Sequence, residues 1–237
     1  MEVAAIIQAR MDSRRFPGKV LKEIKGKPLL SYLRERLEKS PVLNRIVVAT
    51  SEEDSDKPIA DFCRLQGIAC FRGSLKNVAE RFYRLLDLYP VDAFVRISGD
   101  SPLLDHRIVT EAVGLFHKYS SDIVTNVLTR TFPKGQSVEV IRSLFYRQQY
   151  PYFLDAHDRE HVTPFFYRNH DMFNIVNLES GADWGAVQMS VDTCEDFLFM
   201  EKMMGLMDKP HWNYDVNSLM ALRRAVLERE GVPVNNA

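Results

Sequence analysis

Over the first half of the chain, short apolar runs alternate with longer stretches in which apolar residues recur at helical spacing. A short continuous apolar run is typical of a buried strand, whereas recurrence every third or fourth residue indicates a helix with one buried face. The repeated order of strand and helix predicts a parallel sheet with helices on both faces. We therefore expect strands at 3–8, 45–50, 68–71, 93–98 and 122–126, and helices at 28–39, 56–66, 77–88 and 105–118.

The regular alternation ends near residue 129. No repeat, low-complexity tract or linker divides the chain, and 237 residues suit a single α/β domain. We expect one domain over 1–237 whose C-terminal part is an elaboration of the sheet. In that part the pattern predicts strands at 137–142, 173–178 and 187–191, and helices at 158–169 (in spite of Pro164), 195–207 and 217–230.

Composition and charge exclude several classes of protein. A chain with 46% hydrophobic and 27% charged residues is folded rather than disordered. The net charge of −1 argues against binding of nucleic acid or an anionic membrane over the whole surface. No apolar run approaches the length of a membrane span, and the run at residues 3–7 is short for a secretion signal. Three cysteines without a CxxC pair indicate neither a disulfide framework nor a zinc knuckle, and favour a reducing cytoplasm.

The loop after the first strand is strongly basic. Residues 10–27 contain seven cations and two acids, a local excess of five positive charges. Ligands of open α/β sheets bind beyond the carboxyl ends of the strands, where Arg and Lys side chains can hold a polyphosphate. The chain has no GxG, no GxxxxGK[ST] and no GxSxG, so a nucleotide would have to be bound by another kind of loop. A solvated surface loop with unrelated cations is the alternative interpretation.

Two aspartates follow expected strands, Asp100 after 93–98 and Asp192 after 187–191. Two carboxylates at neighbouring strand ends can meet at one site, and Mg²⁺ is commonly held by one or two carboxylates plus substrate phosphates. Such a metal would offset the charge that builds toward a leaving pyrophosphate. The alternative is that each aspartate only caps the helix that follows it.

Residues 8–19 resemble the signature [QP]-A-R-x-x-S-x-R-x-P-G-K of the cytidylyltransferases that activate acidic sugars, such as the acylneuraminate and 3-deoxy-manno-octulosonate enzymes. The branch of the spore-coat polysaccharide protein SpsF is the nearest. Two further family patterns follow in order, [QTS]-x-D-x-P-[LM] at Asp100 and D-T-x-E-D-[LF] from Asp192, so the resemblance extends to about residue 200. The chain departs from the family at Asp12, where Gly is usual. The residues that match the signature are Gln8, Ala9, Arg10, Ser13, Arg15, Pro17, Gly18 and Lys19.

The resemblance implies a three-layer α/β/α sandwich of the nucleotide-diphospho-sugar transferase type, with one antiparallel strand in a mostly parallel sheet. It implies a Mg²⁺-dependent reaction of CTP with a sugar, giving a CMP-sugar and pyrophosphate for surface polysaccharide biosynthesis. It also implies an acceptor and dimerisation lobe over 130–186, and hence a homodimer. The residues so implicated are Arg10, Arg15 and Lys19 at the triphosphate, Ala9 and Ser13 near the nucleotide, and Asp100 and Asp192 at the metal.

Three other stretches resemble the same family. The segment 73–81, ending in Arg81, would face the base or ribose, although Ser74 could equally cap a helix. Glu139 would meet a sugar hydroxyl, unless the stretch around it is only a turn entering a strand. Arg159 and His161 would meet an acidic or phosphorylated acceptor, and the alternative is that they only belong to a capped helix.

Two other functions stay open. His157, Glu160 and His161 fit the H-x-x-E-H pattern of a zinc hydrolase, although no third ligand is evident. Asp12 beside the expected phosphate site leaves room for a relative that binds nucleotides without catalysis.

Overall fold

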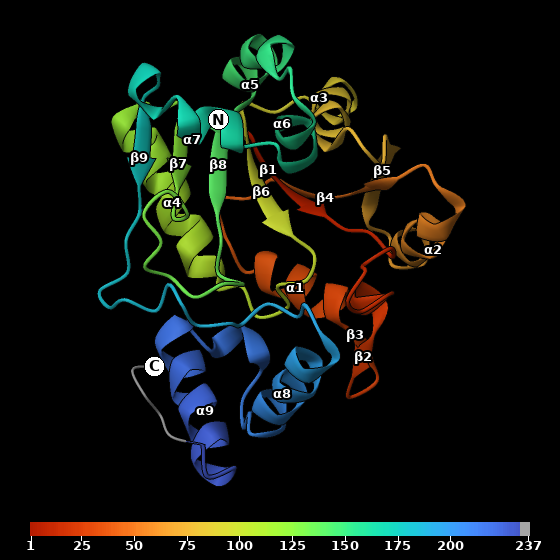
Figure 1. Cartoon of the computed structure of the whole chain (residues 1–237), viewed down its shortest axis with the longest axis vertical. Coiled ribbons are helices and arrows are strands. Elements are labelled where there is room, and N and C mark those ends of the chain that lie inside the picture. The colour runs from red at the N-terminus through yellow and green to blue at the C-terminus, as the bar shows by residue number, and fades with distance from the viewer. Residues whose placement is uncertain (233–237) are drawn as a thin grey trace.

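The computed structural model describes residues 1–232 and is built around a seven-stranded sheet (Figure 1). The strand order is β5-β4-β1-β6-β8-β7-β9. Strand β8 pairs antiparallel with β6 and β7, while the other neighbours pair parallel. The expected sheet, mostly parallel with one antiparallel strand, is confirmed. The strands are β1 (Val3–Gln8), β4 (Arg45–Ser51), β5 (Ala69–Gly73), β6 (Ala93–Ser98), β7 (Ile123–Thr125), β8 (Glu139–Arg142) and β9 (Ile175–Asn177).

Helices cover both faces of this sheet, because its strands are apolar on both sides. In β1, Ala5 and Ile7 pack into one core cluster and Ile6 packs into the other. The three expected layers are therefore present. The first cluster includes side chains of α1 (Leu29–Leu37), α2 (Lys57–Leu65) and α4 (His106–Tyr119); α3 (Val78–Leu88), α5 (Ser143–Gln149), α6 (Ala156–His161) and α7 (Pro164–Arg168) lie on the other side.

A third apolar cluster joins the C-terminal helices α8 (Cys194–Gly205) and α9 (Val216–Arg229) to the β2–β3 hairpin (Glu23–Ile24 and Lys27–Pro28). Figure 1 shows α8 beside the hairpin and α9 on the other side of α8, at the end of the molecule away from α5. The fully buried Arg36 of α1 donates to the carbonyls of Leu104, His211 and Tyr214, which joins α1 to the segment between α8 and α9.

The segment 187–191 was expected to be a strand, and this is wrong. It is extended but makes only an isolated bridge, between Gln188 and Lys134. Its alternating apolar residues, Val187, Met189 and Val191, are buried against α8 and α9 in the third cluster. The twofold alternation therefore reflects packing on helices and not a place in the sheet.

The single helix expected at 158–169 is also wrong. The chain forms α6 and α7 instead, separated at Val162, whose φ of +73° is incompatible with a continuing helix. Pro164 then begins α7, where its missing N–H costs nothing. Helix α5 and the β2–β3 hairpin were not predicted. The other expected elements are present, with ends that differ by a few residues.

In the segment 130–186, which was expected to form a lobe, strands β8 and β9 belong to the main sheet.

Within residues 1–232, none of the helices has the length and apolar character needed to cross a membrane.

Candidate active site

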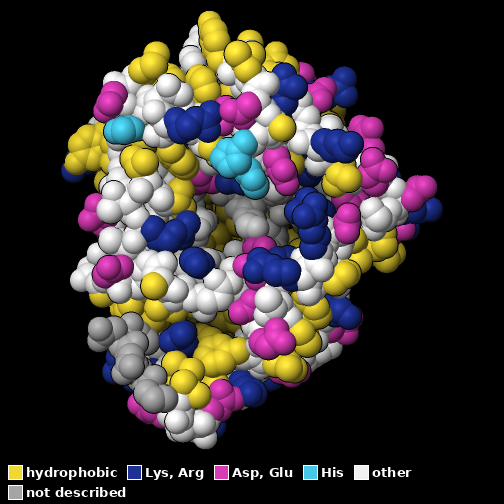
Figure 2. Space-filling view, in the orientation of Figure 1, with side chains coloured by type: hydrophobic (Ala, Val, Ile, Leu, Met, Phe, Trp, Pro, Cys, Tyr) yellow, Lys and Arg dark blue, Asp and Glu magenta, His cyan; other side chains and the backbone are white. Residues whose placement is uncertain are grey.

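A pocket of about 470 Å³ lies where β1 and β6 end, and Gln8 and Ser98 from those ends line it. Figure 2 shows a hollow near the middle of one face, with basic, acidic and histidine side chains around it. Most residues predicted for the site meet in this pocket although they come from distant parts of the chain. They are Ala9, Arg10, Ser13, Arg15, Lys19, Arg81, Asp100, His161 and Asp192.

The basic segment 9–19, here called the anion loop, closes upon itself through Met11. The carbonyl of Met11 accepts from the amide of Ser13 at 2.9 Å and from that of Gly18 at 2.8 Å. Gly18 has a φ of +70°, which L side chains rarely adopt, and this lets the loop turn directly into Lys19. Asp12, the departure from the family pattern, is exposed and is not among the residues that line the pocket.

Lys19 joins the two predicted carboxylates. Its Nζ donates to Asp100 Oδ2 at 2.7 Å and to Asp192 Oδ1 at 2.9 Å. Arg15 reaches the same oxygen of Asp192, with its Nη2 at 3.2 Å. The Lys19 side chain is only 10% exposed, so these bonds are little weakened by water. Two oxygens from distant segments thus already share one cation.

Neither aspartate caps a helix, which removes the alternative interpretation of their positions. Helix α8 is capped by Thr193, in a capping box with Asp196. Helix α4 is capped by Asp105. Asp100 follows Gly99, whose amide donates to Gln8 O at 2.8 Å and holds the two strand ends together. The carboxylates of Asp100 and Asp192 therefore line the pocket, where Lys19 binds both.

The surroundings keep Asp192 ionised. Burial alone raises the pKa of its carboxyl, but the hydrogen bond and charge of Lys19 and the charge of Arg15 outweigh burial and hold the pKa below its ordinary value. Gln188 adds a donor to the second oxygen, Oδ2, at 3.2 Å. The arrangement can hold a cation or receive the positively charged end of a ligand.

Arg81 lines the pocket but directs its donors at main-chain carbonyls. Its Nη2 and Nε donate to Ser74 O at 2.6 and 3.1 Å, and the residue is 2% exposed. Burial lowers the pKa of Arg81 to about 10, so the side chain is charged at neutral pH. It fixes the loop between β5 and α3. Asn77 caps α3, and Ser74, the alternative cap, instead accepts from the amide of Asn77.

The residues predicted for the acceptor side are only partly brought to the pocket. His161 lines it, together with Glu160. Glu139 is buried and already accepts from Arg96 and from the hydroxyl of Tyr167. Arg159 donates through Nε to Phe153 O at 3.0 Å. Glu139 and Arg159 are not among the lining residues.

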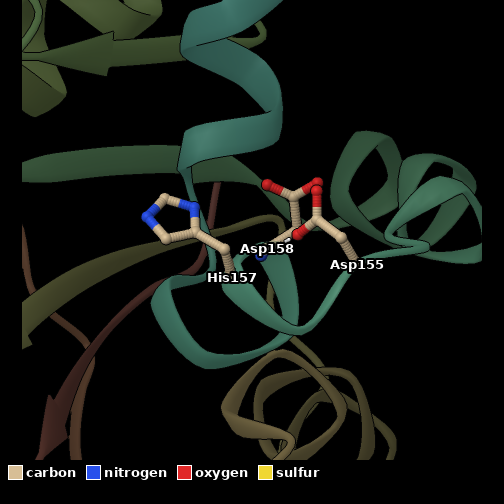
Figure 3. Close-up of side chains that lie close together, drawn as sticks. All are labelled: Asp155, His157 and Asp158. Carbon is tan, nitrogen blue, oxygen red and sulfur yellow. Dashed lines mark hydrogen bonds between the residues drawn. The ribbon is translucent and has the colours of Figure 1, made fainter.

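The two histidines of the zinc alternative, His157 and His161 on α6, meet edge to face with their ring centroids 4.7 Å apart. Among residues 1–232, however, the group able to offer three metal ligands is Asp155, His157 and Asp158, which includes neither Glu160 nor His161 (Figure 3). Asp155 caps α6, and Arg168 donates to Asp158 at 2.6 Å. These carboxylates thus have structural partners.

Some lining residues were not assigned from the sequence. Leu75 and Val78 give the pocket an apolar wall, and Arg14 adds a cation from the anion loop. Leu75 and Val78 lie within the stretch 73–81, which carried only a weak signal. Ser98 comes directly before the glycine that precedes Asp100.

Comparison with known proteins gives matches along most of the chain. The family model for cytidylyltransferases matches residues 4–227. The spore coat polysaccharide biosynthesis protein SpsF of Bacillus subtilis is 30% identical over 225 residues, which cover 92% of this chain and 91% of that protein.

Solved structures also match most of the chain. A cytidylyltransferase from Leptospira borgpetersenii superposes with a TM-score of 0.89 at 27% identity, covering 98% of this chain and 95% of that one. CMP:2-keto-3-deoxy-manno-octonic acid synthetase, solved in complex with CTP, has a TM-score of 0.64 at 17% identity, covering 86% and 99%, and is similar in fold alone.

Proposed function

Because this chain belongs to the cytidylyltransferase family, we propose that it catalyses the reaction of CTP with an acidic sugar, giving a CMP-sugar and pyrophosphate. The hydroxyl oxygen of the sugar bonds to the α-phosphorus, the bond from that phosphorus to the β-phosphate oxygen breaks, and the hydroxyl proton is released. The observation that carries the proposal is Lys19, held between Asp100 and Asp192 at the end of the anion loop.

The cations of the anion loop would bind the triphosphate and stabilise the leaving pyrophosphate. Arg10 and Arg15 are exposed at the pocket, where their planar guanidinium groups can take phosphate oxygens in pairs. Lys19 supplies a point charge, and its ammonium group contacts both carboxylates. Ala9 and Ser13 line the same pocket and would lie near the nucleotide.

The two carboxylates suit a divalent metal, which we propose to be Mg²⁺. Their oxygens lie 2.7 and 2.9 Å from one ammonium nitrogen, so they converge on a single cationic position. Carboxylate oxygens are the ligands that Mg²⁺ prefers. When bound, such an ion neutralises phosphate charge. Asp100 and Asp192 would hold it, after Lys19 has turned to the phosphates.

On the acceptor side, we propose that His161 meets the sugar, because it lines the pocket beside Glu160. Glu139 and Arg159 stay predictions for this role, and each would need to release its present partner. The relative in Bacillus subtilis is named for spore coat polysaccharide biosynthesis, and we propose a polysaccharide pathway in the cytoplasm here too.

Thermal unfolding with each of the four nucleoside triphosphates tests the proposed specificity for cytidine. With Mg²⁺ present, we expect CTP to raise the melting temperature more than ATP, GTP or UTP. A ligand at 100 times its Kd adds about 2.7 kcal/mol of stability. For a chain of this length that corresponds to a rise of roughly 5–10 °C. Equal rises with all four triphosphates would reject cytidine specificity and leave a phosphate site.

Turnover separates the remaining alternatives. A relative that only binds nucleotides shows the CTP shift but releases no pyrophosphate with any acidic sugar of a panel. A zinc hydrolase built on His157, Glu160 and His161 contains stoichiometric zinc after purification and shows no shift with CTP. Either result would replace the proposal.

We also propose a homodimer formed through residues 130–186. Four large apolar side chains of that segment are more than half exposed: Leu144 at 63%, Tyr152 at 61%, Leu154 at 77% and Met172 at 75%. Side chains of this kind are commonly covered by a partner. Light scattering after gel filtration should give twice the chain mass, and Leu154→Glu should lower it toward one chain. A wild-type monomer at tens of micromolar would overturn this prediction.

A further inference from the structure

Asp56 is a fully buried carboxylate outside the predicted site. It lies at the start of α2 and has no exposed surface. Its side chain does not cap that helix. Instead, Oδ2 accepts from the amide of Ser51 at 3.2 Å and from the Ser51 hydroxyl, at the end of β4. A buried charge is costly unless it is fully hydrogen-bonded, so its partners indicate its role.

The third donor to Asp56 comes from the anion loop. The amide of Met11 donates to Asp56 Oδ1 at 2.6 Å, across 45 positions of sequence. Met11 is also the residue whose carbonyl accepts from Ser13 and Gly18. The loop is therefore closed on Met11, and Met11 is attached to the sheet through Asp56.

The attachment continues to the reacting end of the loop. Gly18, held by Met11 O, directly precedes Lys19, whose Nζ binds both carboxylates of the pocket. The side chain of Met11 also packs close to Gly18, where an added Cβ would come within 3.3 Å of its terminal carbon. A shift of Met11 would therefore move Gly18 and, with it, the backbone of Lys19.

The charge of Asp56 is felt nearby as well. Burial holds the pKa of Arg81 below its ordinary value; the charge of Asp56 opposes this shift and the charge of Arg10 adds to it, so the three groups lie close enough to interact. If Asp56 acted only through its charge, it would weaken the binding of a triphosphate at Arg10. If it acts by holding Met11, it strengthens binding. The two roles therefore predict opposite effects of removing Asp56 on triphosphate affinity.

We propose that Asp56 is a positioning residue, which holds the anion loop in the conformation that receives the triphosphate. This rests on the proposed function, since it takes CTP as the ligand. The Met11 anchor makes the binding conformation the populated one in the free protein. When the competent fraction falls, the apparent Kd rises by the same factor.

The test compares Asp56→Asn with Asp54→Asn, an exposed neighbour in the same turn. Asparagine keeps the size of Asp56 but offers one acceptor oxygen, so either Met11 or Ser51 loses its partner and faces an amide donor. In calorimetry with Mg²⁺ and CTP, we expect Asp56→Asn to weaken binding about tenfold and Asp54→Asn to leave it unchanged. In turnover, KM for CTP should rise while kcat stays close to the wild-type value.

An unchanged or tighter Kd in Asp56→Asn would overturn the proposal, including when the melting temperature falls. Hydrogen exchange on the wild-type protein gives a test that needs no variant to fold. The Met11 amide should exchange at least tenfold more slowly than an unprotected loop amide. Unprotected exchange at Met11 would also overturn the proposal. If the wild type fails to bind CTP while Met11 is protected, the proposed function fails and the anchor stands.

Discussion

Replacing Asp100 or Asp192 by asparagine is expected to lower the rate of pyrophosphate release from CTP by roughly 10²–10³-fold, by analogy with loss of one electrostatic stabiliser. Asparagine keeps the shape of each side chain but removes the charge and is a poor ligand for Mg²⁺. A capping role would tolerate the change, because asparagine caps helices well. The caps of α8 and α4 are Thr193 and Asp105, so tolerance is not expected.

The assay is pyrophosphate release with CTP and a panel of acidic sugars, at limiting Mg²⁺. Asp105→Asn is the matched control, since Asp105 caps α4 five residues after Asp100, a role that asparagine can fill, and the change should leave turnover close to the wild-type value. The double variant should lose much less than the product of the two single losses, because both carboxylates serve one cation. Wild-type turnover in either single variant would remove that aspartate from the site.

Lys19→Ala is expected to change two binding constants in opposite directions. Triphosphate binding should weaken by roughly 10- to 150-fold, since a hydrogen bond to a charged group contributes about 1.5–3 kcal/mol. Binding of Mn²⁺ without nucleotide should tighten, because the ammonium no longer occupies the oxygens of Asp100 and Asp192. Calorimetry measures the first constant and electron paramagnetic resonance of free Mn²⁺ the second.

Lys22→Ala serves as the control, since Lys22 is exposed and lies just beyond Lys19 in the same basic segment. A peripheral charge of this kind contributes well below about 1 kcal/mol. Equal losses of triphosphate affinity in the two variants would mean that only the diffuse positive field matters. Unchanged Mn²⁺ affinity in Lys19→Ala would mean that the two carboxylates do not form the metal site.

The parts of the fold that could be predicted are those where one local pattern has one structural outcome. Strands β1 and β4 contain continuous apolar runs, and β6 is apolar apart from Arg96 and its last residue; such runs have few alternatives in an α/β chain. The segment 187–191 shows where this fails, because alternation every second residue suits any extended chain with one buried side. Only its neighbours in space, α8 and α9, decide that it lies outside the sheet.

The contacts of the site also divide into those that the sequence predicts and those that it does not. The meeting of Asp100 with the anion loop could be predicted, since both follow parallel strands and the carboxyl ends of such strands share an edge. Asp56 could not, because an acid at the start of a helix has the same sequence pattern whether it caps that helix or reaches elsewhere. Its bond to Met11 spans 45 positions. Glu139 stays a prediction for the sugar, and its bond to Tyr167, 28 positions away, has no local signal in the sequence.

The distance along the chain between Lys19 and Asp192 also orders events while the protein is being made. Strands β5, β4, β1 and β6 lie side by side and all emerge from the ribosome within the first 98 residues, together with the anion loop. Asp192 follows 173 positions after Lys19, and it is set in place only when α8 packs. A domain generally folds as a unit during synthesis. Until the segment around residue 192 has emerged, Lys19 has Asp100 as a carboxylate partner but lacks Asp192, so a product cut short before α8 carries the anion loop without the second carboxylate of the pocket.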